Sequence, residues 1–225
     1  MATCSLLVLD FDGVVLDSAR IKAAAFSDLF AEHPGHAAAI AELHQQMTGK
    51  SRFLQFEAVY RDLLGADLAA AESAALGERY SDLFQDRVRD CPAVPGAIEF
   101  LEAHGAAHAI WLASGSPHDE LLATLEHRDL LRHFTGFAGT PASKADTVRR
   151  GLLAHGCAPN EAVFVGDARA DREAALATGL RFVGVVQAGD PDPFPPGTST
   201  IVDLHPLDRL LGWSGGLDPE GGDPG

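Results

Sequence analysis

The sequence predicts an α/β protein: a Rossmann-like, three-layer α/β/α core around a parallel sheet, with an all-α helical cap domain inserted into it. Short apolar runs alternate with helix-length segments through most of the 225 residues, which is typical of parallel strands buried on both faces by crossover helices. Between residues 17 and 90 this alternation stops, and the pattern there is helical throughout. The content of 46% hydrophobic and 22% charged residues is that of an ordinary globular protein.

Each expected element follows from the local pattern. Runs of four to eight apolar residues bounded by turn residues predict strands, and longer stretches with a helical period between them predict helices. The expected strands are 6–9, 108–113, 163–165, 182–186 and 200–202, with a short sixth at 137–139. The expected helices between them are 118–127, 145–155 and 172–178.

The insert shows helical periodicity twice. Apolar side chains recur three and four residues apart, so each set lies on one helix face; the two sets are Phe53, Phe56, Tyr60 and Leu63, and Leu76, Tyr80, Leu83 and Phe84. The chain re-enters the core at 91–96, where two prolines and a glycine stop a helix. We therefore expect a core domain of residues 1–16 and 91–211, a cap domain of 17–90, and a disordered Gly/Pro-rich tail of 212–225.

Charge and cysteine content exclude several classes of protein. With 17 Lys and Arg against 32 Asp and Glu, the net charge is −15, which disfavours binding to a phosphate backbone and predicts no nucleic-acid partner. Three widely spaced cysteines argue against a disulfide framework and favour a reducing, cytoplasmic location. No apolar run is long enough to span a membrane, so no membrane partner is expected. A monomer or a homodimer is expected.

Polar residues follow the predicted strands where a ligand site would form. Ligands of open α/β sheets bind outside the carboxyl ends of the strands. Strand 6–9 is followed by Asp10 and Asp12, strand 108–113 by Ser114 and Gly115, and strand 163–165 by Asp167 and Asp171, while Lys144 lies in a connection between strand and helix.

This set of side chains predicts a site for a metal ion and a phosphoryl group. Crowded carboxylates repel one another unless a cation neutralises them, and oxygen ligands without His or Cys suit Mg²⁺, which characteristically shares a phosphate with the protein. Asp10 and Asp12 are two residues apart in an extended chain, so both can reach one substrate. Asp10 is the expected nucleophile and Asp12 the expected acid and base.

The order of these residues resembles that of the haloacid dehalogenase superfamily. The segments that carry the resemblance are DFDGVVLDS at 10–18, ASGS at 113–116, Lys144, and VGDARADREAA at 165–175. The helical insert resembles the α-helical cap of the phosphoglycolate phosphatase-like and β-phosphoglucomutase-like branch, and the resemblance covers about residues 5–211.

The resemblance implies a role for each matching residue. It implies that Asp10 is nucleophile and metal ligand, that Asp12 binds Mg²⁺ through its backbone carbonyl, that Ser114 and Lys144 bind the phosphoryl oxygens, and that Asp167 binds the metal with Asp171 as an additional or outer ligand. Two departures bear on the subgroup. Ala145 follows Lys144 where many phosphatases have proline, and Asp12 stands where dehalogenases lack an aspartate, which favours phosphoryl transfer.

The cap contributes one further candidate, the segment Gly49, Lys50, Ser51 and Arg52. It resembles the substrate-specificity loop of β-phosphoglucomutase-like caps, which supplies a cation to the distal part of the substrate. The alternative is an exposed helix start with ordinary basic residues. Arg20 and Lys22 could face the cleft for the same purpose. Ser114 and Asp171 could also serve only as helix caps.

These observations predict a Mg²⁺-dependent phosphatase that hydrolyses a small phosphorylated metabolite through an aspartyl-phosphate. Three alternatives stay open: a phosphomutase that returns the phosphoryl group to a sugar, a phosphonate hydrolase that uses Lys50 as a Schiff-base amine, and a catalytically inactive binding module.

Overall fold

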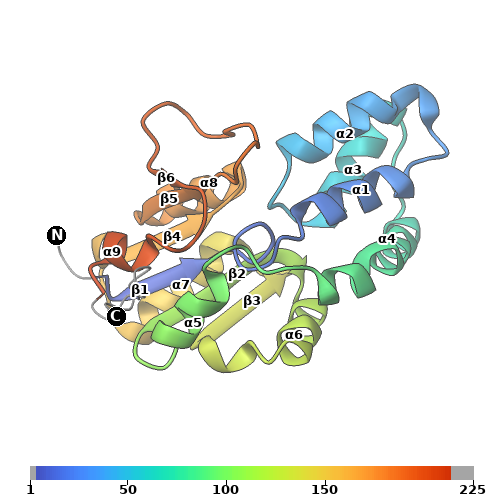
Figure 1. The fold of residues 1–225 in the computed structure, drawn as a ribbon. Helices are drawn as coiled ribbons and strands as arrows, with labels where there is room; N and C mark the ends of the chain where they lie inside the picture. Colours follow the sequence, from blue (N-terminus) through green and yellow to red (C-terminus); the bar gives the residue numbers. More distant parts are fainter. Residues whose placement is uncertain (1–3, 214–225) are drawn as a thin grey trace, which may run out of the picture.

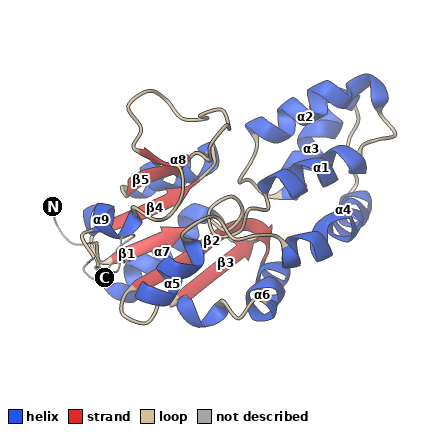
Figure 2. Ribbon diagram, viewed as in Figure 1, coloured by secondary structure: helices blue, strands red, loops and turns tan. Residues whose placement is uncertain are grey.

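The computed structural model describes residues 4–213, and within them a six-stranded, fully parallel sheet forms the centre of the core (Figures 1 and 2). The strand order is β3-β2-β1-β4-β5-β6. The strands are β1 Leu6–Leu9, β2 Ala109–Pro117, β3 Gly136–Thr140, β4 Ala162–Gly166, β5 Arg181–Val185 and β6 Thr200–Ile201. The predicted fold class is confirmed, including the short strand at 137–139.

Helices cover both faces of the sheet. Leu6, Val8 and Phe164 pack against α7 and α8 on one face, whereas Leu7, Leu9 and Ile110 belong to the cluster that includes α5, α6 and α9. The bounds of these helices are α5 Ala97–His104, α6 His118–His127, α7 Lys144–His155, α8 Arg169–Thr178 and α9 Leu207–Leu211. Neighbouring side chains of a strand thus face opposite helix layers, which is why the strands are apolar throughout.

The central position of β1 places its carboxyl end at the topological switch point of the sheet. From β1 the chain builds outward through β2 and β3 on one side, and through β4, β5 and β6 on the other. Crossovers on the two sides leave a crevice beyond the end of β1. Asp10 is the residue at that crevice.

The segment after this point is helical in the described structure, as the sequence predicts. Its helices are α1 Ala19–Leu29, α2 Ala37–Gln46, α3 Arg52–Ala58 and α4 Ala70–Asp90, with a π-helical extension of α3 at Val59–Leu64. Phe26 of α1, Phe56 of α3 and Tyr80 of α4 pack ring against ring in the centre of this bundle. Figure 1 shows the bundle beside the carboxyl end of the sheet, across from the loop between β5 and β6.

Two short antiparallel segments connect the bundle to the core. Leu16 and Ala93 form a β-bridge, and the amide of Val94 donates to the carbonyl of Val15 over 3.1 Å. Arg128 donates to the carbonyls of Arg89 and Cys91 at 2.8 and 2.7 Å, which satisfies acceptors left free at the end of α4. The two connections are therefore held together as one paired linker.

The predicted start of the tail at residue 212 is too early, because Trp213 packs on the core. Trp213 is 4% exposed, stacks on His108 with ring centroids 3.9 Å apart, and donates from Nε1 to the carbonyl of Cys4 over 2.9 Å. The start of the tail was predicted too early because the glycine-rich composition of this segment outweighed one large apolar residue, Trp213. The rest of the predicted tail, 214–225, lies outside the described residues.

In the described part of the chain, no helix combines the length and hydropathy needed to cross a bilayer.

Removing the Trp213 ring is expected to destabilise the protein. The substitution Trp213→Ala should lower the free energy of unfolding by about 3 kcal/mol, because it leaves a cavity beside Phe100 and His108. Urea unfolding measures this. Leu153→Ala, at a side chain that is 85% exposed, is the control and should cost less than about 0.5 kcal/mol. Equal costs for the two variants would contradict the packing described here.

Candidate active site

Three carboxylates converge at the carboxyl end of the sheet. Asp10 follows β1, Asp167 follows the adjacent strand β4, and Asp171 lies in the first turn of α8. Each offers an oxygen within 4.8 Å of the others. Because β1 and β4 are paired in register, residues more than 150 positions apart in the sequence lie side by side here.

Lys144 supplies the ammonium that lies among these acids. Its Nζ is 3.0 Å from Asp10 Oδ1 and 2.6 Å from Asp171 Oδ1, and all three side chains are buried. Burial alone would lower the pKa of Lys144, but the charges of Asp10 and Asp171 outweigh it and raise the pKa above its ordinary value. Lys144 is therefore a permanent positive charge.

The single positive charge of Lys144 does not balance the negative charges of three carboxylates. Burial and the neighbouring Asp171 raise the pKa of Asp10 to about 7, and burial with the charges of Asp10 and Asp171 raises the pKa of Asp167 well above its ordinary value. Asp167 Oδ1 is buried without a hydrogen bond, and Asp10 Oδ1 is buried with the ammonium of Lys144 at 3.0 Å as its charged neighbour. Buried oxygens in this state call for a cation, and an all-oxygen donor set fits Mg²⁺.

Asp171 has less capacity left to bind a metal ion than Asp10 and Asp167 have. Its Oδ1 accepts from Lys144, and its Oδ2 accepts from the backbone amide of Ala168 over 3.0 Å. Both oxygens are thus held by the protein. This arrangement suits the outer position that the resemblance allows, in which Asp171 orients Lys144 and the chain after β4.

Gly13 lets the chain leave β1 without displacing Asp167. Its φ is +81°, and a Cβ at this position would overlap Asp167 Oδ2. Glycine is the residue that adopts this backbone conformation without strain. The absence of a side chain at Gly13 therefore leaves room for the carboxylate of Asp167.

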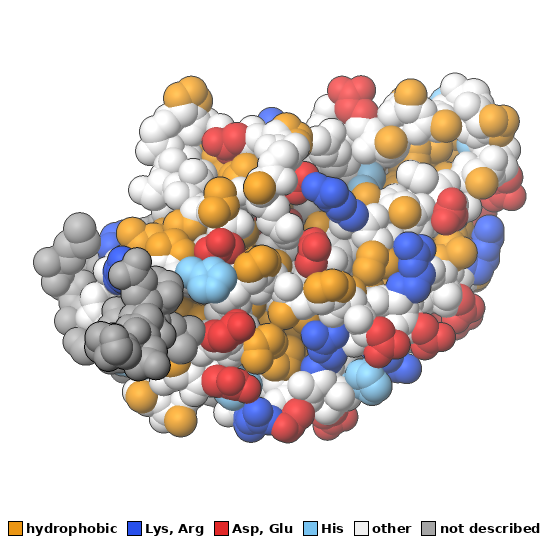
Figure 3. Space-filling model, viewed as in Figure 1, with side chains coloured by type: hydrophobic (Ala, Val, Ile, Leu, Met, Phe, Trp, Pro, Cys, Tyr) orange, Lys and Arg blue, Asp and Glu red, His pale blue; other side chains and the backbone are white. Residues whose placement is uncertain are grey.

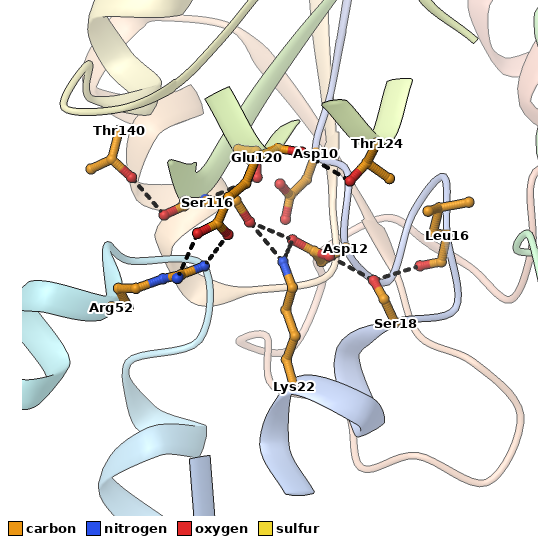
Figure 4. Close-up of polar contacts among 12 residues, drawn as sticks. Asp10, Asp12, Leu16, Ser18, Lys22, Arg52, Ser116, Glu120, Thr124 and Thr140 are labelled. Carbon is orange, nitrogen blue, oxygen red and sulfur yellow. Dashed lines mark hydrogen bonds and ion pairs between the residues drawn. The ribbon is translucent and has the colours of Figure 1, made fainter. Parts of the chain in front are cut away.

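Asp12 is held by the cap and by β2 (Figure 4). Its Oδ1 accepts from Ser18 over 2.6 Å, and its Oδ2 accepts from Lys22 of α1 over 2.5 Å and from Ser116 over 3.2 Å. Burial alone would raise the pKa of Asp12. The charge of Lys22 and the hydrogen bonds from Lys22 and Ser18 have the larger, opposite effect, so the pKa falls below its ordinary value. Both carboxylate oxygens are thus occupied by Ser18, Lys22 and Ser116, which leaves the backbone carbonyl as the metal ligand implied for this residue.

Ser116 is a site residue that sequence reasoning missed. Its hydroxyl lies between Lys22, 2.6 Å away, and Asp12, and it lines the cavity together with Gly115. Ser114 lies deeper, is 2% exposed, and accepts from the amide of Ser116. The spacing could have found Ser116, since residues i and i+2 of a strand share a face.

The predicted cap loop lies against the core. The carbonyl oxygens of Gly49 and Lys50 would be 2.9 and 3.0 Å from a Cβ at Gly115, so the two backbones meet closely there. Gly49, Lys50 and Arg52 line the cavity, whereas Ser51 precedes α3 outside the cavity wall.

Arg52 lines the cavity as expected, but its charge is paired. Its guanidinium donates two hydrogen bonds to Glu120 of α6, at 3.0 and 2.6 Å (Figure 4). Nothing in the sequence pairs these residues, because they are 68 positions apart and lie in different parts of the fold.

A cavity of about 450 Å³ lies between the bundle and the core. Asp10, Asp12 and Asp167 line its core side, and Lys22, Lys50 and Arg52 line its cap side. Lys144, Ser114 and Asp171 lie behind this wall. The surface is hollowed between the cap and the loop that follows β5 (Figure 3), and Arg20 of α1 closes one side by binding Asp190 of that loop at 2.5 Å.

The sequence matches the profile of one protein family over most of its length. Residues 7–185 match the haloacid dehalogenase-like hydrolases. The chain belongs to this family. The match spans every candidate residue described above, so the predicted resemblance is confirmed, and with it the assignment as a hydrolase.

Relatives of the family place the chain near one branch. It is 28% identical to phosphoglycolate phosphatase 1 of Pseudomonas aeruginosa over 185 residues, which cover 78% of this chain and 67% of that protein. The fold resembles a predicted phosphoglycolate phosphatase from Haemophilus somnus, with a TM-score of 0.71, 16% identity and coverage of 93% and 99% of the two chains. It also resembles the β-phosphoglucomutase of Clostridium difficile, with a TM-score of 0.69, 16% identity and coverage of 91% and 93%.

The close approach at Gly13 gives a test of the site geometry. Gly13→Ala should lower the free energy of unfolding by about 2 kcal/mol more than Gly156→Ala, because overpacking adds to the backbone strain. Gly156 is a matched control, since its φ is +60° and nothing lies within 4 Å of an added Cβ. Urea unfolding of both variants measures the difference, and equal losses would show that Gly13 does not contact Asp167 as described.

Proposed function

We propose that this family member is a Mg²⁺-dependent phosphatase that hydrolyses a small phosphate monoester through an aspartyl-phosphate on Asp10. The observation that carries the proposal is the buried Asp10 carboxylate, which lies 3.0 Å from the ammonium of Lys144 and beside the uncompensated Asp167, in the wall of the cavity between the bundle and the core. The phosphoglycolate phosphatases among its relatives support the same chemistry.

In the first step, an oxygen of Asp10 attacks phosphorus and the bond from phosphorus to the leaving oxygen breaks. Asp12, bearing a proton, donates it to the leaving oxygen, so the alcohol departs neutral. Lys144 stabilises the negative charge on the phosphoryl oxygens, because its ammonium is fixed in place by Asp171 before the reaction begins. The products of this step are the alcohol and phosphorylated Asp10.

In the second step, water attacks the phosphorus of the acyl phosphate. Asp12 accepts a proton from that water, the bond from Asp10 to phosphorus breaks, and inorganic phosphate leaves. Lys22 and Ser18 favour the ionised form of Asp12, which is the form that accepts a proton in this step. The proton that Asp12 takes from water is the one that it donates to the leaving oxygen of the next substrate.

Mg²⁺ would be held by the carboxylates of Asp10 and Asp167 and by the backbone carbonyl of Asp12. When bound, it supplies positive charge that keeps Asp10 ionised and offsets the charge of the phosphoryl group. The cap restricts access to the cavity and limits the water that reaches phosphorylated Asp10, which favours small substrates over protein surfaces.

Substitution of the nucleophile tests the proposal. Asp10→Asn should reduce phosphate release in the presence of Mg²⁺ at least ~1000-fold, as loss of a covalent nucleophile does. The assay is inorganic phosphate release from a panel of phosphorylated metabolites. Asp28→Asn, at an exposed acid of α1, is the control and should retain activity. Phosphate release by Asp10→Asn at the wild-type rate would contradict the proposal, and conversion of a sugar phosphate into its isomer would indicate a mutase.

Mg²⁺ should stabilise the protein by relieving the repulsion among the buried acids. At a hundredfold excess over its dissociation constant, the gain is about 2.7 kcal/mol, or roughly 5 to 10 °C in the unfolding midpoint. Asp167→Asn should raise the midpoint of the metal-free protein and abolish the response, whereas Asp28→Asn should retain it. A full response in Asp167→Asn would contradict the assignment of Asp167.

The gain from Mg²⁺ should depend on pH. In the folded protein Asp10 keeps its proton up to a pKa of about 7, whereas the ordinary value is 3.8. The folded state thus binds more protons between these values, and the metal-free protein loses stability as the pH rises through them. The Mg²⁺-induced shift of the unfolding midpoint should therefore be larger at pH 8 than at pH 5. A larger shift at pH 5 would contradict this sign.

A further inference from the structure

Among the described residues, four basic side chains line the cap side of the cavity, and three of them are closely paired with a carboxylate. Lys22 binds Asp12 at 2.5 Å, Arg20 binds Asp190 at 2.5 Å, and Arg52 binds Glu120 at 2.6 Å. A second anionic group on a substrate would have to displace one of these carboxylates, or share its cation, to gain a charged partner.

The pair of Arg52 and Glu120 is the one most firmly held. Arg52 is 5% exposed, donates to Ser81 over 2.6 Å, and stacks its guanidinium on Tyr80 with 4.9 Å to the ring centroid. Glu120 accepts both from Arg52 and from Ser81. A two-pronged, largely buried ion pair of this kind is among the strong polar contacts in proteins, and removal of one partner leaves the other charge uncompensated.

The remaining basic side chains of the cavity wall lie at its outer edge, beside α8. Lys50 is half-exposed and its Nζ is 3.9 Å from Glu173 of α8. Arg169 is exposed at the start of α8 and donates from Nε to the carbonyl of Pro193. Water and salt screen charges at such positions, so they contribute less to selecting a substrate than a buried guanidinium does.

Apart from Asp17, the rest of the cap side is uncharged and includes Ala23, Ala41, His44, Gln45 and Thr48. Burial lowers the pKa of His44, and its Nδ1 shares a hydrogen bond of 2.7 Å with Gln55, so its imidazole is neutral. Amide, hydroxyl and imidazole groups beside methyl groups suit a leaving group that carries hydroxyls and no charge.

We propose that Glu120 is a specificity-determining positioning residue: by neutralising Arg52, it makes the cavity select phosphate esters of uncharged, hydroxylated alcohols over those that carry a second anion. This inference rests on the proposed phosphatase activity and names its substrate class. Glu120 acts through Arg52, on the face of the cavity opposite Asp10 and Lys144.

A matched pair of substrates tests the selectivity of the wild-type enzyme. Phosphoglycolate and 2-hydroxyethyl phosphate have the same two-carbon chain and differ at the distal carbon, which is a carboxylate in one and a hydroxymethyl group in the other. With Mg²⁺ present, the wild-type enzyme should release phosphate from 2-hydroxyethyl phosphate with a kcat/KM at least ~10-fold higher than from phosphoglycolate.

Substitution of Glu120 tests its role. Glu120→Gln keeps the shape and a hydrogen bond to Arg52 but removes the negative charge, so Arg52 becomes available to a carboxylate. The ratio of kcat/KM for phosphoglycolate to that for 2-hydroxyethyl phosphate should rise about 10-fold or more, through a lower KM for phosphoglycolate, as expected for one hydrogen bond to a charged group. Glu126→Gln, at an exposed acid of the same helix, removes the same net charge and should leave the ratio unchanged.

The outcomes separate this inference from the proposed function. A merely structural role of Glu120 would reduce turnover of both substrates and leave their ratio unchanged, which would overturn the inference. A wild-type preference for phosphoglycolate, or an equal rise of the ratio in Glu126→Gln, would overturn it as well while the phosphatase proposal stands. No phosphate release by the wild-type enzyme from these substrates or from p-nitrophenyl phosphate would overturn both.

Discussion

The structure depends on the burial of three carboxylates around one ammonium. Asp10 and Asp171 pair with Lys144, whereas Asp167 lies beside them with a buried oxygen that receives no hydrogen bond, so the group carries an excess of negative charge. Such an arrangement is unfavourable for the protein alone. It is favourable once a cation and a phosphoryl group with balancing charges are present, so stability is given up where chemistry needs it. The parallel sheet makes this possible, because paired strands hold Asp10 and Asp167 together through backbone hydrogen bonds that do not depend on the charges.

The contacts between cap and core have two distinct functions in this account. Lys22 approaches Asp12 and Ser116 from α1, so closure of the cap changes the environment of the proposed acid and base. Arg52 approaches Glu120 and Ser81 farther from the sheet, so the same closure sets the charge that meets the leaving group. The contacts of Lys22 with Asp12 and of Arg52 with Glu120 both join the helical insert to the core. The position of the insert on the core therefore sets the environment of Asp12 and the charge state of the Arg52 pair together.

Much of the fold and of the site could be predicted from the sequence, for reasons visible in particular residues. Asp10 and Asp167 follow buried apolar strands directly and Ser114 lies in the last part of β2, and ligand sites of parallel sheets form at this edge. Lys144 could be predicted from its place in the connection between a strand and a helix, whereas the cap loop at 49–52 required the family resemblance because it follows no strand. The partners of Arg52 and Lys22 could not be predicted, because their contacts with Glu120 and Ser116 span 68 and 94 positions and depend on how the cap sits on the core. The burial of Trp213 was not predicted, because the prediction for this segment rested on its average, glycine-rich composition and not on the one large ring within it.

The most direct measurement of the central claim is chemical trapping of the phosphorylated carboxylate. Acid quenching during turnover, followed by borohydride reduction, converts an acyl phosphate of aspartate into homoserine, and peptide mass spectrometry locates it. The account predicts homoserine at position 10 only when Mg²⁺ and a phosphate ester are both present. Homoserine at position 12 or elsewhere, or phosphate release with Asp10 unmodified under the same quench, would contradict it.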